Sequence, residues 1–92
     1  MLTFDPDCLA RLREMAHRGV APAAMLRVLL ERLDQLHPEE PRAPILALYL
    51  MEALGLEAYQ VSSVFGWNPN GTGPLSDAQL DEVLARHIRV KA

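Results

Sequence analysis

The stretch from Trp67 to Leu84, WNPNGTGPLSDAQLDEVL, constrains the fold of this chain more than any other. It begins with prolines, glycines and asparagines, which favour turns because they fix φ, allow positive φ or close side-chain turns. Ser76 then offers the hydroxyl of a good helix N-cap, and Gln79 three residues later completes a capping box. The stretch therefore predicts a turn followed by a helix from Asp77 to about Val90.

Four further helices are predicted before this turn from apolar residues at helical spacing and from proline or glycine at the ends. The third is apolar almost all round, which is typical of the central helix of a bundle. The expected ranges are from after Asp5 to Gly19, from Pro22 to about Leu36, from Ala43 to Gly55, and from about Glu57 to Phe65. The predicted fold for residues 1–92 is a single all-α domain, a bundle of about five short helices with a helix–loop–helix corner near residues 57–90.

The composition bounds the cellular setting. The chain has 92 residues and one cysteine, Cys8, which excludes an internal disulfide and is typical of a reducing compartment. The N-terminus lacks the basic and apolar regions of a secretory signal. The longest apolar run, Ala43 to Leu54, is too short to cross a bilayer. We therefore expect a cytoplasmic protein that does not enter a membrane.

The charges are unevenly distributed, although the net charge is only −3. Between Ala43 and Ala85 there is no lysine, arginine or histidine, so the acidic residues of this segment have no cation close in sequence. Such a segment predicts an acidic surface, which repels phosphate backbones and suits a basic protein partner. Tyr59 and Trp67 are large amphipathic side chains of the kind that anchor interfaces, although Trp67 could instead fill the bundle beneath the loop. The predicted partner-binding residues are Glu52, Glu57, Tyr59, Trp67, Asn68, Asn70, Asp77, Asp81 and Glu82.

The turn also resembles the calcium loop of the EF-hand family. Oxygen-bearing side chains stand at loop positions one, three, five, nine and twelve, and Gly73 stands at the sixth position, where the family has its sharp turn. No carboxylate stands at these positions, and a glutamine replaces the family's bidentate glutamate. The resemblance implies a weak calcium site, and the alternative is a helix–loop–helix corner that binds no ion. The candidate ligands are Asn68, Asn70, Thr72, Ser76 and Gln79.

A second resemblance is to the helix-turn-helix of bacterial repressors. Gly55 and Leu56, followed by Val61 and Ser62, have the spacing of the turn and recognition helix in that family, over residues 51–65. The resemblance implies a DNA-binding regulator. However, the expected recognition helix contains no cation, and lysine and arginine contacts supply most of the affinity for phosphate. The charge pattern therefore argues against nucleic acid as the partner.

No pattern in the sequence indicates catalysis. The three histidines are scattered and lack other ligands at metal-binding spacing. Cys8 would lie in the first turn of a helix, where the dipole would lower its pKa, but a packed cysteine is the alternative. No phosphate loop or nucleophile elbow is present. We therefore expect no catalytic residues, no metal and no cofactor.

These observations predict a small acidic protein-binding module, of inhibitor, adaptor or immunity type, that covers a basic protein surface. The two alternatives are a DNA-binding regulator that uses residues 51–65 and a weak calcium-binding module. The apolar surplus of the third helix is also compatible with a homodimer.

Overall fold

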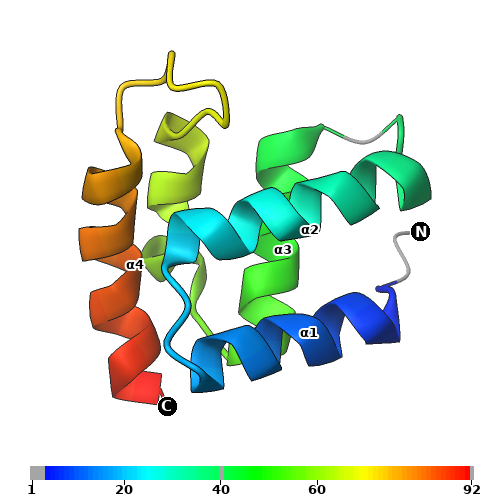
Figure 1. Cartoon of the computed structure of the whole chain (residues 1–92), viewed down its shortest axis with the longest axis horizontal. Helices are drawn as coiled ribbons and strands as arrows, with labels where there is room; N and C mark the ends of the chain where they lie inside the picture. The colour runs from blue at the N-terminus through cyan, green and yellow to red at the C-terminus, as the bar shows by residue number, and fades with distance from the viewer. Residues whose placement is uncertain (1–3, 40, 92) are drawn as a thin grey trace.

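The computed structural model describes residues 4–39 and 41–91, and most of this chain is helical (Figure 1). The α-helices are α1 (Pro6–His17), α2 (Pro22–Leu36), α3 (Arg42–Leu54) and α4 (Asp77–Lys91). Two short 3₁₀ helices, η1 (Ala58–Gln60) and η2 (Ser62–Gly66), lie between α3 and α4 in the chain. Apart from an isolated bridge between Trp67 and Leu75, the described residues contain no β-structure. The predicted all-α class is confirmed.

Local signals set the helix ends. The Asp5 carboxylate accepts a hydrogen bond from the Cys8 N–H at 3.1 Å, which caps α1. The capping box of α4 is formed in both directions: Gln79 N–H donates to the Ser76 hydroxyl at 3.2 Å, and Ser76 N–H donates to the Gln79 side chain at 2.8 Å. At the end of α3, Gly55 has a φ of 68°, the left-handed conformation that glycine adopts without steric cost.

The four α-helices and the two 3₁₀ helices pack around one core. In Figure 1, α1 and α2 run side by side in opposite directions across the front, and α3 lies behind them. α4 lies at the side, where it packs against α2 and η2, while η2 also packs against α3. The core is therefore shared by every helix from α1 to α4. Its most completely buried large side chains are Leu12, Met25, Leu26, Tyr49, Leu50, Val61, Val64, Leu80 and Leu84.

The segment predicted as a fourth helix, about Glu57 to Phe65, is formed by η1 and η2 rather than by an α-helix. Val61, Val64 and Trp67 are all buried, and this spacing of three residues matches the period of a 3₁₀ helix. Two β-branched valines and two serines also give the segment little intrinsic preference for the α-helix. The burial pattern and the local propensity therefore favour the same tighter winding.

Tyr49 joins three parts of the bundle at its centre. Its hydroxyl accepts a hydrogen bond from the Asp5 N–H at 2.8 Å and lies 3.0 Å from the Nε2 atom of His37. The ring of Phe4 packs edge-on against it, with the centroids 4.9 Å apart. Through this one side chain of α3, the start of α1 and the end of α2 are fixed together.

Candidate functional site

The loop between η2 and α4 is held to α2 by a cluster of Arg27, Trp67 and Asp77. The Arg27 guanidinium donates to both carboxylate oxygens of Asp77, at 2.6 and 3.1 Å, and to the Pro69 carbonyl at 2.9 Å. The indole N–H of Trp67 donates to Asp77 at 2.9 Å, and the Arg27 guanidinium carbon lies 5.3 Å from the centre of the Trp67 ring. Trp67 is only 6% exposed. The cluster therefore anchors the loop to α2, and the buried Trp67 ring is not available to a partner.

The electrostatics of this cluster follow from its hydrogen bonds. The Arg27 guanidinium, and then the Trp67 indole, hold the pKa of Asp77 below its ordinary value. The hydrogen bond to Asp77 raises the pKa of Arg27. The charge of Asp77 is thus paired with that of Arg27, which lies on the neighbouring helix α2.

Two other acidic side chains of α4, those of Asp81 and Glu82, also have partners within the protein. Asp81 accepts a hydrogen bond from the Ala23 N–H at 2.7 Å. This N–H is one of the free donors at the start of α2, whose N-cap residue provides no side-chain cap. Glu82 forms an exposed ion pair with Arg86 at 3.5 Å. Asp77 and Asp81 are thus both bonded to groups of α2, although the Asp77 side chain is still 46% exposed, and their contact with a partner stays a prediction.

The loop predicted to resemble an EF-hand uses several of its oxygens internally. The Asn70 side chain accepts hydrogen bonds from the N–H and the hydroxyl of Thr72, at 3.1 and 2.6 Å. The side-chain oxygens of Ser76 and Gln79 belong to the capping box. The left-handed glycine is Gly71, with a φ of 81°, rather than Gly73.

Gly73 has a different structural role in this loop. A Cβ atom at Gly73 would lie 2.8 Å from the Gly66 carbonyl oxygen and 2.9 Å from the Asn68 nitrogen, so the backbone leaves no room for a side chain. Asn68 is half-buried, with its carbonyl bonded to the Gly71 N–H, whereas Asn70 is exposed. No group of three His, Cys, Asp or Glu side chains in the described part of the chain could hold a metal ion. Calcium binding by the amide and hydroxyl oxygens stays a prediction.

The geometry of residues 51–65 departs from a helix-turn-helix. Gly55 and the buried Leu56 do form a turn after α3. The expected recognition helix, however, is the pair η1 and η2, which have three and five residues. A recognition element of this kind is normally an α-helix that fits the major groove. DNA binding through residues 51–65 stays a prediction, and the segment lacks the α-helical recognition element that such binding normally uses.

Two aromatic side chains of η1 and η2 are strongly exposed: Tyr59 is 72% exposed and Phe65 is 59% exposed. Both 3₁₀ helices lie against α4, because η2 packs on it and the Tyr59 ring meets His87 edge-on at 6.3 Å. Val83, one turn before His87, is also exposed. We call Tyr59, Phe65 and Val83 the aromatic face. The sequence prediction included Tyr59 and missed the other two, since they occupy apolar positions of predicted helices.

Two of the predicted carboxylates are exposed around the turn from α3 to η1. Glu52 at the end of α3 and Glu57 before η1 are exposed, and neither forms an ion pair within the described residues. No cation lies near them in sequence, although Arg13 of α1 donates to the carbonyl of Ala53, the residue after Glu52, at 2.9 Å. Of the residues predicted to bind a partner, Glu52, Glu57 and Tyr59 are thus the exposed ones around the turn from α3 to η1.

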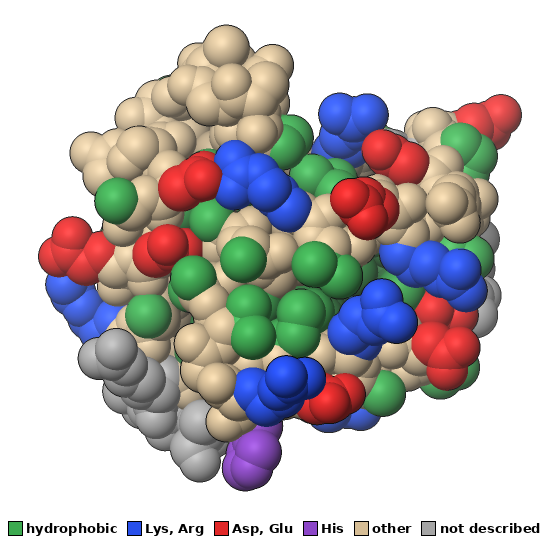
Figure 2. Space-filling model, viewed as in Figure 1, with side chains coloured by type: hydrophobic (Ala, Val, Ile, Leu, Met, Phe, Trp, Pro, Cys, Tyr) green, Lys and Arg blue, Asp and Glu red, His purple; other side chains and the backbone are tan. Residues whose placement is uncertain are grey.

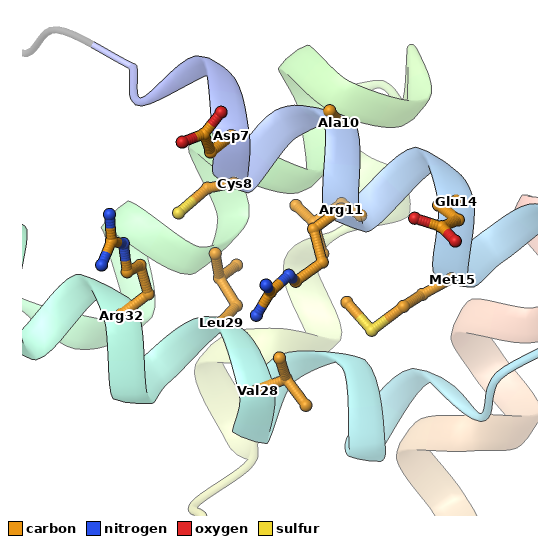
Figure 3. A pocket seen from close by; sticks show the side chains of 10 residues that line it. Asp7, Cys8, Ala10, Arg11, Glu14, Met15, Val28, Leu29 and Arg32 are labelled. Atoms are coloured by element: carbon orange, nitrogen blue, oxygen red, sulfur yellow. The ribbon is translucent and has the colours of Figure 1, made fainter.

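A groove of about 400 Å³ lies between α1 and α2, on the face shown in Figure 2. Hydrophobic side chains gather in this groove, with arginines beside them. In Figure 3, Arg11 reaches from α1 towards α2, and Arg32 points from α2 towards the end of the groove that holds Cys8. The lining residues are Asp7, Cys8, Ala10, Arg11, Leu12, Glu14, Met15, Val28, Leu29 and Arg32.

Cys8 is a packed residue rather than a reactive one. Its side chain is 5% exposed. Burial, together with the Asp5 carboxylate, raises the pKa of the thiol to about 11. The expectation that the helix dipole would lower this pKa is therefore wrong, because desolvation and a neighbouring negative charge oppose the dipole.

The comparisons with known proteins leave the site to be judged on its own chemistry. No protein-family model matches the chain, and neither a curated protein nor a solved structure matches it significantly. Among the described residues, no helix combines the length and the apolar character that crossing a bilayer would require.

Proposed function

We propose that the protein is a non-catalytic binding module that engages a basic surface of another protein through its aromatic face. The observation that carries this proposal is the exposure of Tyr59 and Phe65 in one short segment. Isolated exposed apolar residues are common, but two large aromatic side chains close in sequence form the kind of anchor that dominates binding energy. An inhibitor, adaptor or immunity-type protein would use such a surface.

Charge supports a basic partner. Glu52 and Glu57 precede Tyr59 in the chain and are exposed, and the segment from Ala43 to Ala85 contains no cation. Carboxylates at the rim of an interface accelerate association with a positive surface, whereas aromatic anchors slow dissociation. Trp67, Asp77 and Asp81 act indirectly in this proposal, because they hold the loop and α4 in place beside η2.

The experiment is affinity capture from cells that make the protein, followed by titration of the purified captured protein. Wild type is compared with Tyr59→Ala/Phe65→Ala, and the matched control is Leu36→Ala/Leu48→Ala, which removes exposed apolar side chains from α2 and α3. We expect a basic partner whose affinity falls at least about tenfold in the aromatic variant, as hot-spot truncation predicts. The control variant should bind like wild type, and salt should slow association.

Several results would refute the proposal. The aromatic variant could retain full affinity, or the partner whose binding depends on Tyr59 and Phe65 could be acidic and bind without sensitivity to salt. Clear binding to random DNA in a gel shift at low salt, weakened by added salt, would favour the DNA-binding alternative instead.

A further inference from the structure

The groove between α1 and α2 combines apolar and charged side chains, and no other part of the described chain covers it. Leu12 and Leu29 form its buried floor, and Val28 and Met15 reach its exposed edge. The other helices pack elsewhere: α3 lies behind the pair and α4 at its side (Figure 1). The groove of about 400 Å³ therefore faces solvent, as Figure 2 shows.

Two positive charges in this groove have no partner among the described residues. Arg11 and Arg32 line it, and neither has a hydrogen-bond or ion-pair partner among the described residues. Every other arginine whose side chain is described has such a partner; these are Arg13, Arg18, Arg27, Arg42 and Arg86.

The two acidic residues of the groove lining are placed differently. Glu14 pairs with Arg18 at 3.5 Å, one turn further along α1. Asp7 lies in the first turn of α1, where the helix dipole favours a negative charge. Within the described part of the chain, the groove thus presents two unpaired guanidinium groups beside an apolar floor.

We infer that this groove binds an acidic amphipathic helix of a partner protein. Two antiparallel helices leave between them a channel into which the side-chain ridge of a third helix packs. Apolar residues three and four apart on that helix would cover Val28 and Met15, as in other helix-in-groove complexes. Carboxylates beside them would meet the planar donors of Arg11 and Arg32, which suit bidentate pairing.

The apolar floor distinguishes this occupant from nucleic acid. Arginine also binds phosphate, but a phosphate backbone would leave Val28 and Met15 in water and bury no apolar surface. An amphipathic helix satisfies both the guanidinium groups and the apolar strip between them. The inference is independent of the aromatic face, which lies on η1, η2 and α4.

The test is a binding titration with a fluorescein-labelled helical peptide made of leucine and glutamate, in which successive leucines are alternately three and four residues apart. The same peptide with lysine in place of glutamate is the control probe. The groove variant is Arg11→Glu/Arg32→Glu, and the matched control variant is Arg42→Glu/Arg86→Glu, which reverses two exposed arginines outside the groove. Circular dichroism establishes that both variants keep the helical fold.

We expect the glutamate peptide to bind wild type and the control variant alike, and to bind the groove variant at least about tenfold more weakly. The groove variant should instead gain affinity for the lysine peptide, which a merely structural role of the arginines would not produce. Bound peptide should also slow the alkylation of Cys8, the thiol at the end of the groove. Tyr59→Ala/Phe65→Ala should bind the peptide like wild type, so the failure of one proposal leaves the other standing.

Other occupants would overturn the inference. It fails if the glutamate peptide does not bind, or if both double variants lose it equally, since binding would then follow net charge alone. It fails if decanoate binds with the same dependence on Arg11 and Arg32 while the peptide does not, which would indicate a small carboxylate site. It also fails if light scattering shows self-association that the groove variant abolishes, because the occupant would then be a second copy of this chain.

Discussion

The replacement Tyr49→Phe tests how the centre of the bundle is held together. The side chain is fully buried, and its hydroxyl is hydrogen-bonded to the Asp5 N–H and lies within hydrogen-bond distance of His37. Phenylalanine keeps the ring and its apolar contacts but removes this oxygen. The Asp5 N–H then loses its acceptor at the start of α1, and the His37 ring loses its neighbour at the end of α2.

The magnitude follows from the energetics of buried hydrogen bonds. A protein hydrogen bond contributes about 1 kcal/mol net, and a buried donor left without an acceptor costs about 1–3 kcal/mol. We therefore expect Tyr49→Phe to lower the free energy of unfolding by about 2 kcal/mol. In a domain of this size that corresponds to a melting temperature lower by about 10 °C.

The assay is thermal and urea unfolding followed by circular dichroism, with Tyr59→Phe as the matched control. Tyr59 is the only other tyrosine and is 72% exposed, so the loss of its hydroxyl should change stability by less than about 0.5 kcal/mol. Burial also raises the pKa of the Tyr49 phenol. A phenol that ionises above its ordinary pKa should therefore vanish from the absorbance titration of Tyr49→Phe alone. Equal stability of the two variants would refute the role assigned to the Tyr49 hydroxyl.

Three further predictions concern other parts of the structure. Asp77→Asn removes a carboxylate whose pKa is lowered by Arg27. The ionised carboxylate contributes stability that is present above the unfolded pKa near 3.8 and is lost as the pH falls. The variant should therefore melt at a lower temperature, and its melting temperature should fall less on acidification. A melting curve with unchanged acid dependence would contradict this. Burial raises the pKa of Cys8 from 9.0 to about 11. A thiol reagent should therefore react slowly with the native protein at neutral pH and quickly in urea, and fast labelling of the native protein would be inconsistent with this. The free energy of unfolding should also decline above about pH 9, where the unfolded thiol ionises. Gly73→Ala places a Cβ atom 2.8 Å from the Gly66 carbonyl and should cost about 1–3 kcal/mol in urea unfolding, whereas wild-type stability would show that the loop yields freely.

The helix boundaries could be predicted from the sequence because their causes lie within a few residues of each other. The Asp5 cap, the reciprocal bonds of Ser76 and Gln79, and the left-handed Gly55 are contacts between near neighbours, and each is present where the residue types indicated it. The apolar spacing likewise indicated an all-α bundle. Such signals need no knowledge of how the helices pack.

The candidate sites depended on contacts between distant residues. Arg27 and Asp77 are 50 positions apart, and Ala23 and Asp81 are 58 apart, so a count of charges along the chain could not show that α2 occupies those carboxylates. The groove between α1 and α2 exists only once two helices lie side by side. Residues 57–65 became 3₁₀ helices because of which side chains the core buries.

The sequence by itself therefore determined where the α-helices begin and end, since capping groups and glycine conformations act over one turn. Only the tertiary structure decided which charges stay free, which aromatic side chains face water and where a partner can dock. The physical reason is that burial and ion pairing depend on distances in space, and packing alone sets those distances.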